Sequence, residues 1–134
     1  MKRVFLGFLH ENIWEVNQFR AVIGNEYVGA MAYDESLKDP VKSLSVTYIK
    51  SKLTDMIDRA GMAILLVSDD SWKDPDGWLD WEMTTAWELG KKVAAMKFKN
   101  APYARDPAFL SKFKISAAQW NVDTIRRWMA DEEA

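Results

Sequence analysis

The segment between Asp69 and Glu82 holds the side chains of this sequence that could do chemistry. Asp69, Asp70 and Trp72 follow an apolar run, and Trp78 lies four residues before Glu82. On a helix this spacing places Trp78 and Glu82 on one face, so the Glu82 carboxylate is expected to point inward. Burying a charge is costly unless it is paired. The residues therefore leave two interpretations equally open: a functional carboxylate at a cleft, or a structural one that stabilises the start of the helix or pairs with a buried lysine or arginine.

Several kinds of site are excluded by residues that the sequence lacks. There is no cysteine, and His10 is the only histidine, so thiolate catalysis, disulfides and Cys-ligated or multi-histidine metal sites are ruled out, and no metal is expected. Neither GxGxxG nor GxxxxGK(S/T) occurs, so no Gly-rich phosphate-binding loop is expected. No GxSxG motif occurs either, so a Ser–His–Asp hydrolase that uses His10 is not expected. A receiver domain needs a lysine after its fifth strand, and Ala117–Gln119 offers none.

Charge and hydropathy narrow the class of partners. Lys and Arg number 18 and Asp and Glu number 20, which gives a net charge of −2. This balance predicts no surface for nucleic acid or for an anionic membrane. The apolar run Val4–Leu9 is shorter than a secretory signal, and no run reaches the ~18 residues of a membrane span. With 134 residues and no repeat or linker, the chain is expected to be a single cytoplasmic domain, residues 1–134.

Short apolar runs alternate with helical patterns along the chain. Strands are predicted at Val4–Leu9, Tyr27–Ala32, Met62–Val67 and Val93–Met96. Helices are predicted from Asn12 to Ile23, Ile49 to Ala60 and Trp78 to Leu89, near Phe109, and around Ile125–Met129. Asn12 with Glu15 resembles a capping box, Asn121 or Asp123 caps the last helix, and Gly90 is the expected end of the Trp78 helix.

This alternation is typical of a parallel sheet with helices on both faces. Such sheets bind ligands beyond the carboxyl ends of their strands, which here means the loops after Leu9, Ala32 and Val67. The polar stretch Tyr33–Ser45 is long for a connection inside a compact domain, and long loops of this kind are more often functional than incidental.

Tryptophan is the unusual residue in the composition, with seven copies. Four of them are expected to be packing residues on helices or beside the last strand, namely Trp14, Trp87, Trp120 and Trp128. The other three, Trp72, Trp78 and Trp81, are expected to form a wall around Glu82. Trp72, which lies in the loop before the helix, could stack on a nucleobase or a nicotinamide ring.

Several segments together resemble the TIR-like domain family, and within it the TIR-like proteins of bacterial Thoeris anti-phage systems. The resemblance covers roughly residues 3–98 and is carried by Arg3–Phe8, Asp34–Leu37, Pro40–Ser43 before Tyr48–Lys50, Ile64–Trp72, Trp78–Glu82 and Gly90–Val93. Two features depart from the family pattern: Gly7 stands where many members carry serine, and the acidic pair Asp69–Asp70 is unusual.

The resemblance implies a flavodoxin-like, three-layer α/β/α fold with a mainly parallel five-stranded sheet. It also implies an enzyme that cleaves NAD+ at the nicotinamide glycosidic bond, with Glu82 as the catalytic carboxylate. The residues that would contact the NAD+ substrate are Phe8, Leu9, His10, Asp34, Asp70, Trp72 and Trp78. The product would be a cyclic or modified ADP-ribose signal for a separate effector protein, and a homo-oligomer is compatible with this role.

Two other functions remain open from the sequence. A non-catalytic TIR-like module would bind a protein partner or a nucleotide through the loop Tyr33–Ser45. A nucleoside deoxyribosyltransferase-like enzyme also uses a glutamate in a related fold, but the further acidic, Asn or Tyr contacts to ribose cannot be assigned here.

Overall fold

The computed structural model describes residues 4–9, 12–23, 27–29, 46–74 and 77–130. Its elements, in chain order, are β1 (Val4–Gly7), α1 (Ile13–Ile23), β2 (Tyr27–Gly29), α4 (Val46–Arg59), β3 (Met62–Val67), the 3-10 helix η3 (Ser71–Lys73), α5 (Trp78–Glu88), β4 (Lys92–Lys97), the 3-10 helix η5 (Ala108–Phe113) and α6 (Val122–Ala130). The predicted alternation of strands and helices is confirmed. The predicted loop Tyr33–Ser45 lies outside the described residues.

The strands form one parallel sheet in the order β2-β1-β3-β4. This is the order of the first four strands in flavodoxin-like folds. The two central strands are buried along their whole length, which agrees with their apolar sequences. Because all the strands are parallel, β1, β3 and β4 end at the same edge of the sheet. We call it the carboxyl edge.

The expected fifth strand is not a strand in the described part of the chain. Ala118 forms a single parallel bridge with Met96, closed by Lys97 N to Ala118 O (2.8 Å) and Ala118 N to Ala95 O (2.9 Å). Loop contacts hold the neighbouring residues instead, since Ala117 N donates to an Asp106 carboxylate oxygen and the Gln119 side chain donates to a loop carbonyl. The prediction of five strands was therefore wrong, and the described sheet has four.

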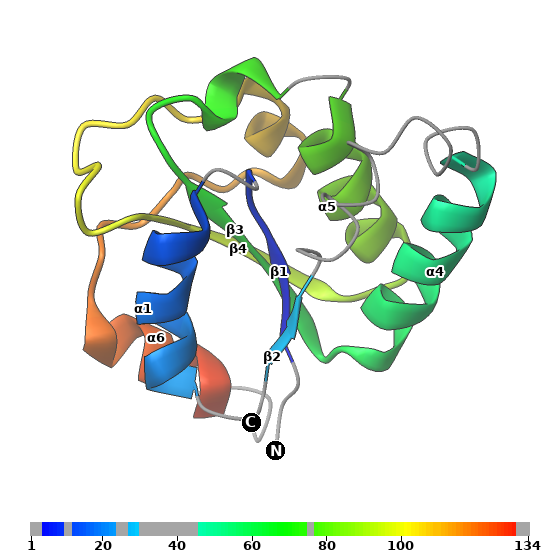
Figure 1. Cartoon of the computed structure of the whole chain (residues 1–134), viewed down its shortest axis with the longest axis horizontal. Coiled ribbons are helices and arrows are strands. Elements are labelled where there is room, and N and C mark those ends of the chain that lie inside the picture. The colour runs from blue at the N-terminus through cyan, green and yellow to red at the C-terminus, as the bar shows by residue number, and fades with distance from the viewer. Residues whose placement is uncertain (1–3, 10–11, 24–26, 30–45, 75–76, 131–134) are drawn as a thin grey trace.

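Helices cover both faces of the sheet (Figure 1). In that view α1 and α6 pack together on one side, and α4 and α5 pack together on the other. Helix α5 contacts β1, β3 and β4, so it crosses the middle of the sheet. The longest described helix, α4, has 14 residues, and none of the described helices combines the length and hydropathy that a bilayer crossing requires.

The ends of the helices show which sequence signals hold. Gly90 ends α5 in the left-handed region with φ 78°, and its N–H donates to Trp87 O while Lys91 N donates to Ala86 O, which is a Schellman motif. Asn121 caps α6 by accepting from Thr124 N at 3.0 Å. The capping box expected at Asn12 does not form: its side-chain oxygen is buried and accepts no hydrogen bond within the described residues.

Candidate functional site at the carboxyl edge

Glu82 is a buried acidic side chain on α5, with 3% of its surface exposed. The inner face of the helix consists of Leu79, Glu82, Met83 and Ala86, all buried against the sheet. The inward direction predicted for Glu82 is confirmed. The helical spacing of Trp78 and Glu82 did not indicate that Met83 is fully buried on this face, nor that Leu89 after the helix is exposed.

The Glu82 carboxylate lies against the end of β1. A Cβ atom placed on Gly7 would stand 3.0 Å from Glu82 Oε1 and 2.8 Å from Met83 Cε. Glycine at this position therefore leaves the space into which the two side chains of α5 extend. The departure from serine that the sequence shows at residue 7 has a structural correlate, since any side chain there would push on the Glu82 carboxylate.

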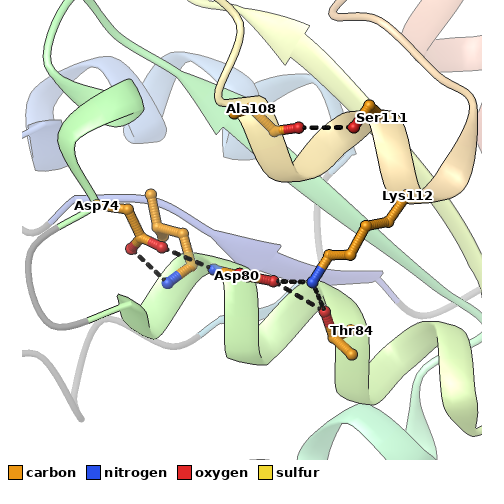
Figure 2. Close-up of polar contacts among 7 residues, drawn as sticks. Asp74, Asp80, Thr84, Ala108, Ser111 and Lys112 are labelled. Atoms are coloured by element: carbon orange, nitrogen blue, oxygen red, sulfur yellow. Dashed lines mark hydrogen bonds and ion pairs between the residues drawn. The ribbon is translucent and has the colours of Figure 1, made fainter.

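Asp74 fixes the start of α5 (Figure 2). Its Oδ1 accepts from Leu79 N at 2.7 Å, and its Oδ2 accepts from Asp80 N at 2.9 Å, so one carboxylate caps two N–H groups of the first turn. Asp74 itself has φ 37° in the left-handed region. Asp74 was not among the caps predicted from the sequence, although an acidic residue a few positions before a helix start was the available signal.

Replacing Asp74 with alanine is expected to lower the free energy of unfolding by about 1–2 kcal/mol. The variant loses both hydrogen bonds, and alanine, which has no polar side chain, must adopt the positive φ of residue 74. Asp74→Asn is the matched control, because asparagine tolerates the left-handed region and keeps one acceptor, and about half of the loss is expected. Urea unfolding of the three proteins measures the effect, and an Asp74→Ala midpoint equal to that of wild type would contradict the assigned cap.

The turn after β3 is held by two buried serines. Ser71 Oγ accepts from Ser68 N at 2.7 Å and lies 3.1 Å from Ser68 Oγ. This pair, which the sequence interpretation did not single out, orders the residues that follow β3 at the carboxyl edge. Asp70 is exposed there and forms an ion pair with Lys73 at 3.3 Å.

Trp78 and Trp81 form one aromatic pair beside Glu82 along α5. Their rings meet edge to face at 5.9 Å, and both are partly buried. The Lys50 ammonium of α4 lies 5.4 Å from the Trp78 ring and 5.3 Å from the Trp81 ring. These cation–π contacts tie α4 to the helix that carries Glu82.

Trp72 belongs to a different cluster. Its ring is 41% exposed and is covered by the Arg105 guanidinium, whose central carbon lies 4.5 Å from the ring centroid. Within the described residues no ring contact joins Trp72 to Trp78 or Trp81. The three tryptophans therefore do not form one wall around Glu82. Trp78 and Trp81 form a pair on α5, and Trp72 lies apart from them after β3.

A polar cluster ties the outer face of α5 to η5 (Figure 2). The Lys112 ammonium donates to Asp80 Oδ1 and to Thr84 Oγ1, and Thr84 Oγ1 donates to Asp80 Oδ1 at 2.9 Å. Both ions are substantially exposed, so the ion pair contributes only about 0–1 kcal/mol to stability. The cluster matters because it fixes α5, the helix that carries Glu82, against η5 in the C-terminal part of the chain.

The remaining predicted site residues are Phe8, Leu9, His10 and Asp34, and the structure describes the first two. Phe8 is 2% exposed and belongs to the core, and Leu9 is half-buried beside it. A side chain as buried as Phe8 offers almost no surface to a ligand. The predicted contacts His10 and Asp34 lie outside the described residues.

Four tryptophans were expected to be packing residues, and this holds for two of them. Trp120 packs edge to face on Phe19, and Trp128 packs against the core. Trp14 was expected to pack but is 78% exposed, and Trp87 is half exposed although its ring contacts Phe113. Helical spacing alone does not show which side of a short amphipathic helix meets the sheet.

Other candidate sites are few in the part of the chain that the structure describes. No group of three or more His, Asp or Glu side chains there could hold a metal ion. A surface hollow lies on α4, lined by Lys52, Asp55, Met56, Asp58 and Arg59. None of these residues belongs to the carboxyl edge, so Glu82 and its surroundings remain the candidate site.

The family model described as Thoeris protein ThsB, TIR-like domain, matches residues 5–103. The chain therefore belongs to the Thoeris ThsB TIR-like domain family, which confirms the resemblance carried by its motifs and makes it a defence-associated TIR-like protein. The matched segment contains Gly7, Trp78 and Glu82 and ends before η5 and α6. A comparison with curated proteins gives no match.

Proposed function

We propose that this chain cleaves NAD+ at the bond between nicotinamide and its ribose, with Glu82 as the catalytic carboxylate. The product is an ADP-ribose-type nucleotide, linear or cyclic, that signals to a separate effector protein in anti-phage defence. The observation that carries the proposal is the burial of Glu82 at the carboxyl edge, against Gly7, in a member of this family. Acidic side chains buried at the ligand-binding edge of a parallel sheet are candidates for function.

The chemistry requires a negative charge near the ribose. When the glycosidic bond breaks, both of its electrons leave with the pyridinium nitrogen, and nicotinamide departs as a neutral molecule. The positive charge then resides on the anomeric carbon and ring oxygen of the ribose. The Glu82 carboxylate stabilises this oxocarbenium-like centre. Water or a hydroxyl of the same ADP-ribose then attacks the anomeric carbon and loses its proton.

The same proposal assigns the substrate contacts. The half-buried Leu9 follows β1 and the half-buried Trp78 begins α5, and these positions support the proposal that both residues contact the substrate. Trp72 and Asp70 follow β3 at the same edge. The full proposed contact set is Leu9, His10, Asp34, Asp70, Trp72 and Trp78, with no metal, and Phe8 has a packing role in the core next to Leu9.

The test is direct detection of the products. Purified protein is incubated with NAD+, alone and in lysate from phage-infected cells, and nicotinamide and ADP-ribose-type products are separated by chromatography. Equal molar amounts of the two are expected. A parallel incubation with a deoxynucleoside and a free base detects base exchange, which is not expected. Exchange without nicotinamide release, or no release under either condition, would overturn the proposal.

A further inference from the structure

Two loops at the carboxyl edge bring an arginine onto an exposed tryptophan. Trp72 lies in η3, directly after β3, and Arg105 lies in the connection between β4 and η5. Figure 1 shows η3, η5 and the first turn of α5 at the same end of the molecule. The pair therefore lies at the end of the sheet where Gly7 and Glu82 also meet, which is where parallel sheets bind ligands.

The Arg105 guanidinium lies over the Trp72 ring and is paired with no acidic side chain among the described residues. Its central carbon is 4.5 Å from the centroid of the Trp72 ring, a close cation–π contact. Within the described residues Arg105 forms no ion pair. The carboxylate of the adjacent Asp106 accepts a hydrogen bond from the backbone N–H of Ala117. Among the residues that the structure describes, none accepts from the N–H groups of Arg105, which are therefore available to an anionic ligand.

The second cation beside Trp72 differs in this respect. Lys73 lies 5.8 Å from the same ring, but its ammonium is paired with the Asp70 carboxylate at 3.3 Å. The two charges of that pair offset each other. Of the two cations next to the exposed indole, Arg105 is the one whose charge is not matched by a described acidic neighbour.

We propose that Arg105, oriented by Trp72, binds the diphosphate group of the dinucleotide substrate. This inference rests on the proposed function, because the diphosphate is the anionic part of NAD+ and joins its two nucleosides. A planar guanidinium recognises phosphate oxygens through two parallel hydrogen bonds, and its orientation on the indole reduces the entropy lost on binding. Arg105 lies beyond the segment 5–103 that the family model matches, so the match does not assign it this role.

Direct binding measurements test the proposal without requiring turnover. ADP and adenosine are titrated by calorimetry into wild type, Arg105→Ala and Lys73→Ala. We expect Arg105→Ala to weaken ADP binding by about 10- to 100-fold, the range for a lost charge-assisted hydrogen bond. Lys73→Ala is the matched control for the loss of one positive charge beside Trp72, and it is expected to weaken ADP binding less than Arg105→Ala does, because Lys73 donates to Asp70 and Arg105 is the residue proposed to contact the phosphates. Adenosine, which lacks phosphate, should bind wild type and Arg105→Ala equally.

Turnover gives a second readout. Arg105→Ala should raise the KM for NAD+ and leave kcat near the wild-type value, because the diphosphate is remote from the bond that breaks. Wild type that does not bind ADP, or ADP binding that Arg105→Ala does not change, would overturn the phosphate site. Arg105-dependent ADP binding by a protein that releases no nicotinamide would support the phosphate site and overturn only the proposed function.

Discussion

Release of nicotinamide from NAD+ is expected to fall by about 10²- to 10³-fold when Glu82 is replaced with glutamine, the range found when one electrostatic group at a developing charge is removed. Glutamine has nearly the shape of glutamate, so it fits the buried position between α5 and β1. It lacks the negative charge that stabilises the oxocarbenium-like centre. The loss should appear in kcat, measured by chromatography of nicotinamide.

The matched control is Glu88→Gln, the same chemical change on the same helix. Glu88 is exposed, whereas Glu82 is buried. Turnover of Glu88→Gln should equal that of wild type, and the melting temperatures of both variants show whether the fold is intact. A Glu82→Gln variant with wild-type turnover would remove Glu82 from the mechanism.

Gly7→Ala is expected to lower kcat by about 10- to 100-fold, because displacement of a catalytic group by a fraction of its own length has effects of this size. The added Cβ would stand 2.8 Å from Met83 Cε and 3.0 Å from Glu82 Oε1. Both atoms are ends of flexible side chains, so the fold should adapt at a cost of about 1–3 kcal/mol. The carboxylate moves in doing so, whereas the residues proposed to bind the rest of NAD+ do not, and KM should change less than kcat.

A double variant separates the two contacts of the new Cβ. Met83→Leu removes the Cε atom and nearly conserves side-chain volume. If the Met83 contact caused the whole effect, Gly7→Ala combined with Met83→Leu would regain the turnover of Met83→Leu alone. We expect no such recovery, because the Cβ still contacts Glu82 Oε1. Full recovery, or a Gly7→Ala variant with wild-type kcat, would show that residue 7 does not position Glu82.

Local sequence patterns predicted the alternation of strands and helices, the parallel direction of the strands and the inward direction of Glu82. β3 matches its predicted range Met62–Val67, because six apolar residues between polar ones fit a strand that is buried on both faces. Gly90 marked the end of α5 for an equally local reason, its ability to adopt positive φ. These features depend on neighbours in the sequence, so one sequence suffices to predict them.

Contacts between distant segments were not predictable in the same way. No local pattern pairs Lys112 with Asp80 or stacks Arg105 on Trp72, since each contact depends on how loops return over the sheet. The exposure of Trp14 was missed because aromatic residues favour burial on average, and only the packing of α1 on the sheet decides its direction. The expected fifth strand is reduced to the single bridge at Ala118, and no local pattern in the sequence shows how far such pairing extends.

The parallel order β2-β1-β3-β4 also has a consequence for how the chain is made. β1 is synthesised well before β3, which is one of its two neighbours in the sheet, and Val4 pairs with Met62, 58 residues further along the chain. Contacts this distant form slowly, because a long loop must close before any pairing stabilises it. Until β3 leaves the ribosome, the apolar residues of β1 lack their central partner. The nascent chain, more than the finished domain, is therefore the state in which this protein is open to aggregation and to chaperones.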